Sequence, residues 1–193
     1  MIIHVGGIPG SGKTYICSQL KGVTCVDIDD IVEEAYEKAR DNKYFKKQIH
    51  DDTFPYIWDK ETTLLREKYI QKSKDKNQPF VLVGVSSTVG PDVGFFIKID
   101  DLDATYRRYM IRELNKIVDN KTKIKDIIDK TEDPYFINYD IIMKINGAGL
   151  IAYSSYKESY ENGLEQAEKD EYQILTQKEI IEEIKKLIDT DKN

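Results

Sequence analysis

The stretch that decides the fold is MIIHVGGIPGSGKT, residues 1–14. An apolar run over 1–7 predicts a buried strand that ends in glycine, and the segment 11–20 has the pattern of a helix. Between them, residues 7–14 match G-x-x-x-x-G-K-[ST] without a mismatch. Glycines let the backbone N–H groups of such a turn surround an anion, and the N-terminus of the following helix adds partial positive charge. We therefore expect a phosphate-binding turn between the first strand and the first helix.

The motif also assigns roles to individual residues. A nucleotide is expected to lie against Gly7, Ile8, Pro9, Gly10, Ser11, Gly12, Lys13 and Thr14. The Lys13 ammonium is expected to reach the β- and γ-phosphates, and the Thr14 hydroxyl to bind Mg²⁺. The alternative is a glycine-rich turn with an incidental lysine, but the complete motif lies between a strand and a helix, as a phosphate site requires. ATP and Mg²⁺ are therefore the expected ligands.

Length and charge limit the class of protein. The chain has 193 residues and a net charge of −6, which predicts a single domain over 1–193 and disfavours a nucleic-acid partner. No apolar run approaches the ~18 residues of a membrane helix, so no membrane partner is expected. Two cysteines, Cys17 and Cys25, are too few for a disulfide framework and suit a reducing compartment, which favours the cytoplasm.

Strand-like and helix-like segments alternate along the rest of the chain. Strands are expected at 24–28, 80–85, 94–99 and 171–176, and helices at 30–41, 56–74, 101–118 and 177–188. This alternation predicts an α/β protein with a five-stranded, mainly parallel sheet. The segment 115–165 is expected to form a lid or insertion.

Three aspartates follow the second predicted strand in VTCVDIDDIVEEAY, residues 23–36. Strand alternation predicts that Asp27 and Asp29 point to the same side. Asp30 is expected to cap the next helix, with Glu33 three residues later as its capping-box partner. Two carboxylates beside a phosphate-binding turn suit Mg²⁺ binding, assigned to Asp27, and proton abstraction from an acceptor hydroxyl. The alternative is a solvated acidic turn.

The pairing of GIPGSGKT with DIDDIVE resembles the P-loop kinases of small molecules. The pattern D-x-D-x-x-[IV]-E of shikimate kinase is matched by Asp27, Asp29, Val32 and Glu33. The resemblance implies the three-layer P-loop NTPase sandwich with a helical lid, and it gives metal and acceptor roles to the first two aspartates. It also implies that adenine packs near Thr176 and Gln177.

A second resemblance lies in YRRYMIREL, residues 106–114, which contains three of the chain's five arginines. Arg108 and Arg112 are four apart, on one face of the predicted helix. This spacing is similar to the R-x-x-x-R at the start of the lid in adenylate kinase and gluconate kinase, which implies that the two arginines clamp the transferring phosphoryl group; Arg107 is adjacent to them. The planar guanidinium suits phosphate. The alternative is an exposed helix face.

Two classes of function stay open. The first is an ATP-dependent phosphotransferase that moves the γ-phosphate to a nucleotide, a nucleoside or a metabolite hydroxyl. The second is a P-loop hydrolase or switch without an acceptor, disfavoured because the strand at 80–85 ends without the metal-binding aspartate common in such proteins. A polynucleotide 5′-kinase is a third candidate, disfavoured by the acidic balance. The chain is expected to be a monomer or a homodimer.

The strands expected at 80–85 and 94–99 are separated by few residues, which predicts an unusual connection between them. If the strands at 80–85 and 94–99 flank the first strand in parallel, the residues between them are too few for the usual helical crossover. We expect a loop without a helix, and one sheet face that must be covered by the segment 133–163 or by a second subunit. Two further sets of residues are expected in the core: His4, and the helix face formed by Tyr153, Tyr156 and Tyr160.

Overall fold

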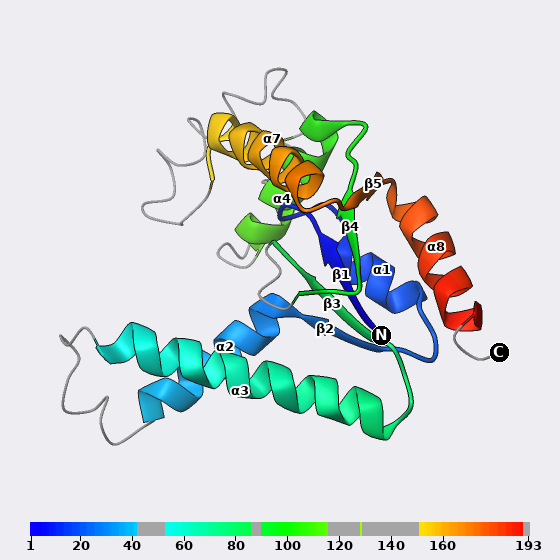
Figure 1. The fold of residues 1–193 in the computed structure, drawn as a ribbon. Helices are drawn as coiled ribbons and strands as arrows, with labels where there is room; N and C mark the ends of the chain where they lie inside the picture. The colour runs from blue at the N-terminus through cyan, green and yellow to red at the C-terminus, as the bar shows by residue number, and fades with distance from the viewer. Residues whose placement is uncertain (42–52, 86–89, 116–127, 129–150, 191–193) are drawn as a thin grey trace.

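The structure is a computed structural model that describes residues 1–41, 53–85, 90–115, 128 and 151–190. Over these residues the chain is an α/β protein with five strands in one sheet and six helices (Figure 1). In chain order the elements are β1 (Ile2–Gly6), α1 (Lys13–Gln19), β2 (Thr24–Asp27), α2 (Ile28–Asp41), α3 (Thr53–Asp75), β3 (Phe80–Gly84), β4 (Val93–Ile97), α4 (Leu102–Asn115), α7 (Tyr153–Lys169), β5 (Gln173–Leu175) and α8 (Gln177–Thr190).

The sheet has the strand order β2-β3-β1-β4-β5, and every pair is parallel. The central strand β1 pairs with β3 in the register Ile2↔Phe80 and with β4 in the register Ile3↔Val93. The prediction that β3 and β4 flank β1 in parallel is therefore confirmed. Because all strands run the same way, their carboxyl ends meet at one edge of the sheet, where the turn 7–14 that follows β1 and Asp27 at the end of β2 also lie.

The crossover from β3 to β4 is short, since β3 ends at Gly84 and β4 begins at Val93. As predicted, neither Val85 nor the segment 90–92 is helical. The rest of this link, 86–89, lies outside the described residues. Both strands nevertheless keep their positions on opposite sides of β1, so the connection crosses the sheet within this length of chain.

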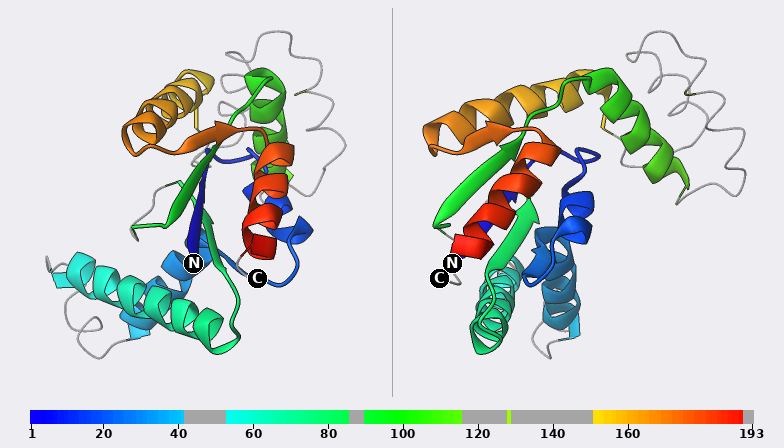
Figure 2. Two further views of the ribbon diagram at one scale, coloured as in Figure 1. Left: turned by 45° about the vertical axis from the view of Figure 1, so that its right-hand side comes forward. Right: turned by 90° about the vertical axis from the view of Figure 1, so that its right-hand side faces the viewer.

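Helices cover both faces of the sheet. On one face, α1 and α8 contribute Ile16 and Ile184 to a cluster with Val5 and Phe95. The other face is divided, because α2 and α3 lie beneath β2 and β3 while α7 crosses β4 and β5 (Figure 2). Within the described ranges, none of the helices combines the length and apolar character needed to span a membrane.

The helix α7 supplies the cover that the short crossover does not. Tyr160 of α7 stacks on Phe96 of β4 with ring centroids 6.2 Å apart. A Cβ atom on Gly163 would lie 2.7 Å from the same phenyl ring, so the two elements approach as closely as glycine allows. The predicted covering role of 133–163 is confirmed for residues 153–163 of α7, whereas residues 133–150 lie outside the described part of the chain. The predicted core tyrosines are all buried: Tyr153, Tyr156 and Tyr160.

His4 is buried in the middle of β1, as predicted, with 2% of its surface exposed. Its Nδ1 lies 3.0 Å from the Tyr172 hydroxyl, and the two rings meet edge to face. Burial, together with the positive charge of Lys13, lowers the pKa of His4 to about 4, although Asp170 opposes the shift. The imidazole is therefore neutral at pH 7.

Candidate functional site

The segment 7–14 connects the end of β1 to the start of α1 and has the backbone of a tight, glycine-dependent turn. Gly10 and Gly12 have φ values of 80° and 93°, in the left-handed region that favours glycine. A Cβ atom on Gly10 would also lie 3.0 Å from the Cβ of Tyr109, and one on Gly12 would overlap the Gln177 side chain. Both conformation and space therefore require glycine at these two positions.

Lys13 is buried and folds back across this turn. Its Nζ donates hydrogen bonds to the carbonyl oxygens of Gly7, at 2.7 Å, and Ile8, at 3.1 Å. Burial lowers the pKa of Lys13; the carboxylates of Asp27 and Asp29 oppose this shift, and Arg112 adds to it. The ammonium is thus held beside the turn, where an anion can compete with the two carbonyls for its hydrogens.

The aspartates of β2 and α2 differ from the sequence prediction. The helix α2 begins at Ile28, so Asp27 ends the strand and Asp29 lies in the first helical turn. The Asp27 carboxylate accepts a hydrogen bond of 3.1 Å from the Asp29 backbone N–H, which makes Asp27 the N-cap. The prediction that Asp30 caps this helix is wrong. Because α2 begins at Ile28, Asp27 occupies the capping position. Asp29 and Asp30 then lie in the first turn of the helix, where the helix dipole favours negative charge.

Asp27 is the more enclosed of the two predicted active-site carboxylates, since Asp29 is exposed. Burial raises the pKa of Asp27, and the neighbouring charge of Asp29 adds to the shift. The hydrogen bond from the Asp29 backbone and the charge of Lys13 act in the opposite direction. The raised pKa makes the Asp27 carboxylate a better proton acceptor than an ordinary surface aspartate.

The helix α4 carries the predicted arginines. Arg108 donates a 2.7 Å hydrogen bond to the Thr105 hydroxyl. Arg112 pairs with Glu113 at 2.7 Å and lies 5.9 Å from the centre of the Tyr109 ring. Arg107 instead donates to the carbonyl oxygen of Ile128 and is absent from the lining of the site's cavity. The helix therefore presents two of its three arginines to the site.

A cavity of about 630 Å³ lies between the turn, the aspartates and α4. Its lining comprises Pro9, Gly10, Gly12, Lys13, Thr14, Asp27, Asp29, Val85, Arg108, Tyr109, Arg112 and Glu113. All five residues predicted to be catalytic are among them, although they come from three parts of the chain. Of the predicted nucleotide-binding residues, Gly7 and Ile8 contribute the carbonyls that bind Lys13, and Ser11 lies at a neighbouring cavity.

That neighbouring cavity, of about 330 Å³, lies between the turn and the loop after β5. Its lining includes Ser11, Arg108, Thr176 and Gln177. The Gln177 side-chain amide donates to the carbonyl oxygen of Ser11, which joins the C-terminal part of the chain to the turn. Arg108 lines both cavities, which places them next to each other.

Sequence analysis missed the tyrosines that support the turn. The Tyr156 hydroxyl of α7 donates to the carbonyl oxygen of Pro9, and the Tyr156 ring stacks on Tyr109 at 5.4 Å. The spacing of the α7 tyrosines predicts burial, which is correct. It contains no signal for a hydrogen bond to a residue 147 positions away in the sequence.

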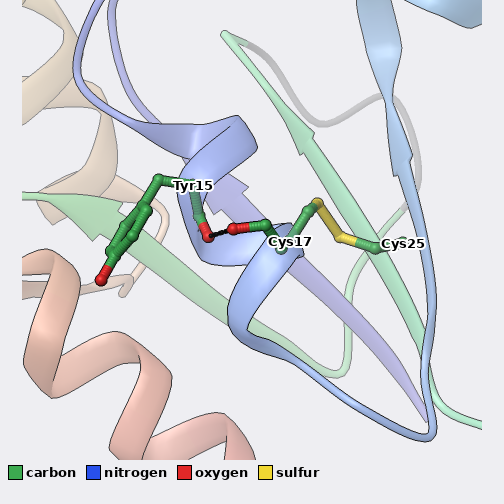
Figure 3. Close-up of a disulfide and its surroundings, with 4 residues drawn as sticks. Tyr15, Cys17 and Cys25 are labelled. Atoms are coloured by element: carbon green, nitrogen blue, oxygen red, sulfur yellow. Dashed lines mark hydrogen bonds between the residues drawn. A yellow bond between two sulfur atoms is a disulfide. The ribbon is translucent and has the colours of Figure 1, made fainter.

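Cys17 and Cys25 form a disulfide that joins α1 to β2 (Figure 3). The interpretation of the two cysteines as suited to a reducing compartment therefore loses its basis, because the two form a bridge with each other. The reason is topological. Packing α1 beside the sheet brings the two Cα atoms to 5.7 Å, within the usual range for a disulfide.

A scan against known protein families finds no match for this chain, and a search of curated proteins finds none either. Among the described residues, no group of three or more His, Cys, Asp or Glu side chains is arranged to hold a metal ion. Mg²⁺ does not need such a group, since it is commonly bound by one or two carboxylates together with substrate phosphates and waters. Thr14 and Asp27, which line the same cavity, fit that kind of site.

Proposed function

We propose that the chain is an ATP-dependent phosphotransferase with the P-loop NTPase fold, which transfers a γ-phosphate to a small acceptor. The observation that carries the proposal is the large cavity, where Lys13, two arginines and two aspartates from separate elements surround one space. The strand order and the glycine-dependent turn are compatible with this fold.

The turn would bind the nucleotide through its phosphates. Backbone N–H groups of the segment 7–14 and the N-terminus of α1 provide positive potential. The Lys13 ammonium would exchange its bonds to the Gly7 and Ile8 carbonyls for bonds to phosphate oxygens. The base would lie in the smaller cavity, beside Thr176 and Gln177.

Thr14 and Asp27 would hold Mg²⁺, which neutralises phosphate charge when bound. Asp29, exposed at the mouth of the cavity, would accept the proton of the acceptor hydroxyl, with the enclosed Asp27 as the alternative base. Arg108 and Arg112 would stabilise the negative charge on the transferring group. Before any ligand binds, Arg108 contacts Thr105 and Arg112 contacts Glu113.

Two features support transfer to an acceptor over simple hydrolysis. Asp27 at the end of β2 and Asp29 in the first turn of α2 line the same cavity as Lys13 and the arginines of α4, so an acceptor can lie between these carboxylates and the phosphates. In addition, β3 ends in Gly84 and Val85 and contributes no carboxylate of the kind that hydrolases commonly use for Mg²⁺.

The proposal is tested by measuring ATP consumption with a panel of nucleosides, nucleoside monophosphates and metabolite alcohols, with Mg²⁺ and with EDTA. We expect turnover that requires both Mg²⁺ and one class of acceptor, and none for Lys13→Ala. ATP consumption at the same rate without any acceptor would identify a hydrolase instead. No ATP binding under any condition would contradict both.

A further inference from the structure

The disulfide joins the two elements that carry opposite halves of the candidate site. Cys17 lies one helical turn after Lys13 in α1, and Cys25 lies two residues before Asp27 in β2. Figure 3 shows the bridge passing from the helix to the strand. The bond therefore limits how far the Asp27 carboxylate can move from the turn that holds Lys13.

The strand β2 is paired on one side. Among the described strands it is an edge strand that pairs with β3 alone, whereas β1 pairs with strands on both sides. An edge strand exchanges backbone hydrogen bonds on one side only. Of its four residues, Val26 alone is buried. The covalent link to α1 therefore adds a restraint on Asp27 beyond the pairing with β3 and the packing of Val26 against α2 and α3.

Both cysteines are half-buried and not enclosed, and the chain between them includes the exposed residues Lys21 and Gly22. A dithiol reductant can therefore act on the bond by ordinary exchange. The reductant's thiolate attacks one cysteine sulfur and forms a mixed disulfide with it, while the other cysteine leaves as a thiolate and takes up a proton. The second thiol of the reductant then displaces the first cysteine from the mixed disulfide. Two electrons pass to the protein, which gains two thiols while the reductant becomes a disulfide.

We propose that Cys17 and Cys25 form a reversible thiol–disulfide site that regulates nucleotide binding; this inference rests on the function proposed above. In the disulfide form, Asp27 is held within reach of Thr14, and ATP binds strongly with Mg²⁺. Reduction by a dithiol releases the edge strand and weakens the Mg²⁺-dependent part of the affinity. Phosphate binding by the backbone of the turn is unchanged.

Two measurements on the full chain, with and without dithiothreitol, test this inference. In the ligand-free protein, reduction is expected to raise amide hydrogen exchange in the segment 24–29 and to leave β1 unchanged. In calorimetric titrations with Mg²⁺, reduction is expected to weaken ATP binding about fivefold or more. The same titrations in EDTA are expected to shift by less than about twofold, because only the backbone turn and Lys13 then contribute.

The double variant Cys17→Ser/Cys25→Ser is the control and should match reduced wild type under both conditions. Alkylation followed by mass spectrometry verifies the oxidation state, and wild type alone decides the matter if the variant does not fold.

Unchanged exchange in 24–29 on reduction would overturn the inference. Raised exchange with unchanged Mg²⁺-dependent affinity would overturn the regulation but leave the proposed function intact. No ATP binding by either form would remove the proposed function, and the regulation with it.

Discussion

The two sides of the large cavity are held in different ways. On the cationic side, Lys13 is buried against the turn, and α4 and α7 pack together through stacked tyrosines. On the acidic side, Asp27 and Asp29 lie at the end of an edge strand and in the first turn of α2, where the second of them is exposed. Burial thus positions Lys13 and the helix that carries the two exposed arginines, while the acidic side depends on a helix cap, one strand pairing, the packing of Val26 and a disulfide. Substitutions on the two sides should therefore differ in how they change turnover and the free energy of unfolding.

The largest effect is expected on the cationic side. Lys13→Ala should reduce phosphoryl transfer by about 10³- to 10⁵-fold, the range found for cations that contact transferring phosphates. ATP affinity should fall as well, because Lys13 is the one lysine within the segment 7–14. Coupled assays of ATP consumption and calorimetric titration measure the two effects.

The matched control for this substitution is Lys21→Ala, which removes an exposed lysine from the loop between α1 and β2. It should leave both turnover and affinity unchanged. Wild-type turnover in Lys13→Ala would contradict the proposed phosphate site and with it the assignment of the cationic side.

On the acidic side, Asp27→Asn should affect activity alone. Turnover should fall by about 10²- to 10⁴-fold, because an amide cannot accept the proton or hold Mg²⁺ as a carboxylate does. Asparagine is as good an N-cap as aspartate, so the free energy of unfolding should change by less than about 0.5 kcal/mol. Steady-state kinetics and urea unfolding measure the two quantities.

Asp30→Asn provides the comparison for that variant, because Asp30 is exposed and absent from the lining of the cavity. It should retain wild-type turnover and stability. An inactive Asp30→Asn variant beside an active Asp27→Asn variant would show that the acidic side has been assigned to the wrong carboxylate.

Acidification should destabilise the buried centre of the sheet. The pKa of His4 is lowered to about 4 in the folded chain, whereas an unfolded histidine titrates near about 6.5. The unfolded state therefore binds more protons between these values, and stability is lost as the pH falls. From about pH 7 to about pH 5 the loss attributable to His4 should be about 2 kcal/mol.

Urea unfolding of wild type and His4→Gln at both pH values isolates this contribution. Carboxylates with lowered pKa values, such as Glu34 and Glu179, lose their stabilising effect only below this window. The raised pKa of Asp27 acts in the opposite direction, since protonation favours its buried form. An equal loss in the two proteins would contradict a buried, neutral His4.

The smallest effect is expected from the contact between α7 and the turn. Tyr156→Phe removes only the hydroxyl that donates to the Pro9 carbonyl. Burial raises the pKa of Tyr156, so this hydroxyl remains a donor at neutral pH. Its loss should lower the free energy of unfolding by about 1 kcal/mol and weaken ATP binding by a similar free energy.

Tyr15→Phe, at an exposed position on α1, is the control and should change stability little. Equal stability but weaker ATP binding in Tyr156→Phe would indicate that the hydroxyl only shapes the turn. Unchanged values for both quantities would show that burial of the rings, without this hydrogen bond, positions the cationic side.

Sequence reasoning succeeded where a local pattern determines the outcome. The glycine-dependent turn at 7–14 and the alternation of strands and helices follow from motif and period, and the mainly parallel sheet follows from that alternation. It failed at the start of α2, because Asp27 and Asp30 are equally good caps and only the packed helix distinguishes them. It also missed the disulfide and the contact from Tyr156 to Pro9, because both depend on which elements pack together and neither leaves a periodic signal.

The all-parallel sheet also sets an order of events during synthesis of the chain. Among the five described strands β1 is synthesised first. It pairs at its start with Phe80 of β3 and Val93 of β4, and β2 also pairs with β3. No strand pair can therefore form until β3 has been made, and loop closures of this length slow folding. Until then the nascent N-terminal half consists of separate helices and unpaired apolar strands. Exposed strand edges favour aggregation in this state. Chaperone demand should accordingly end once translation has passed β4, when β1 acquires partners on both sides.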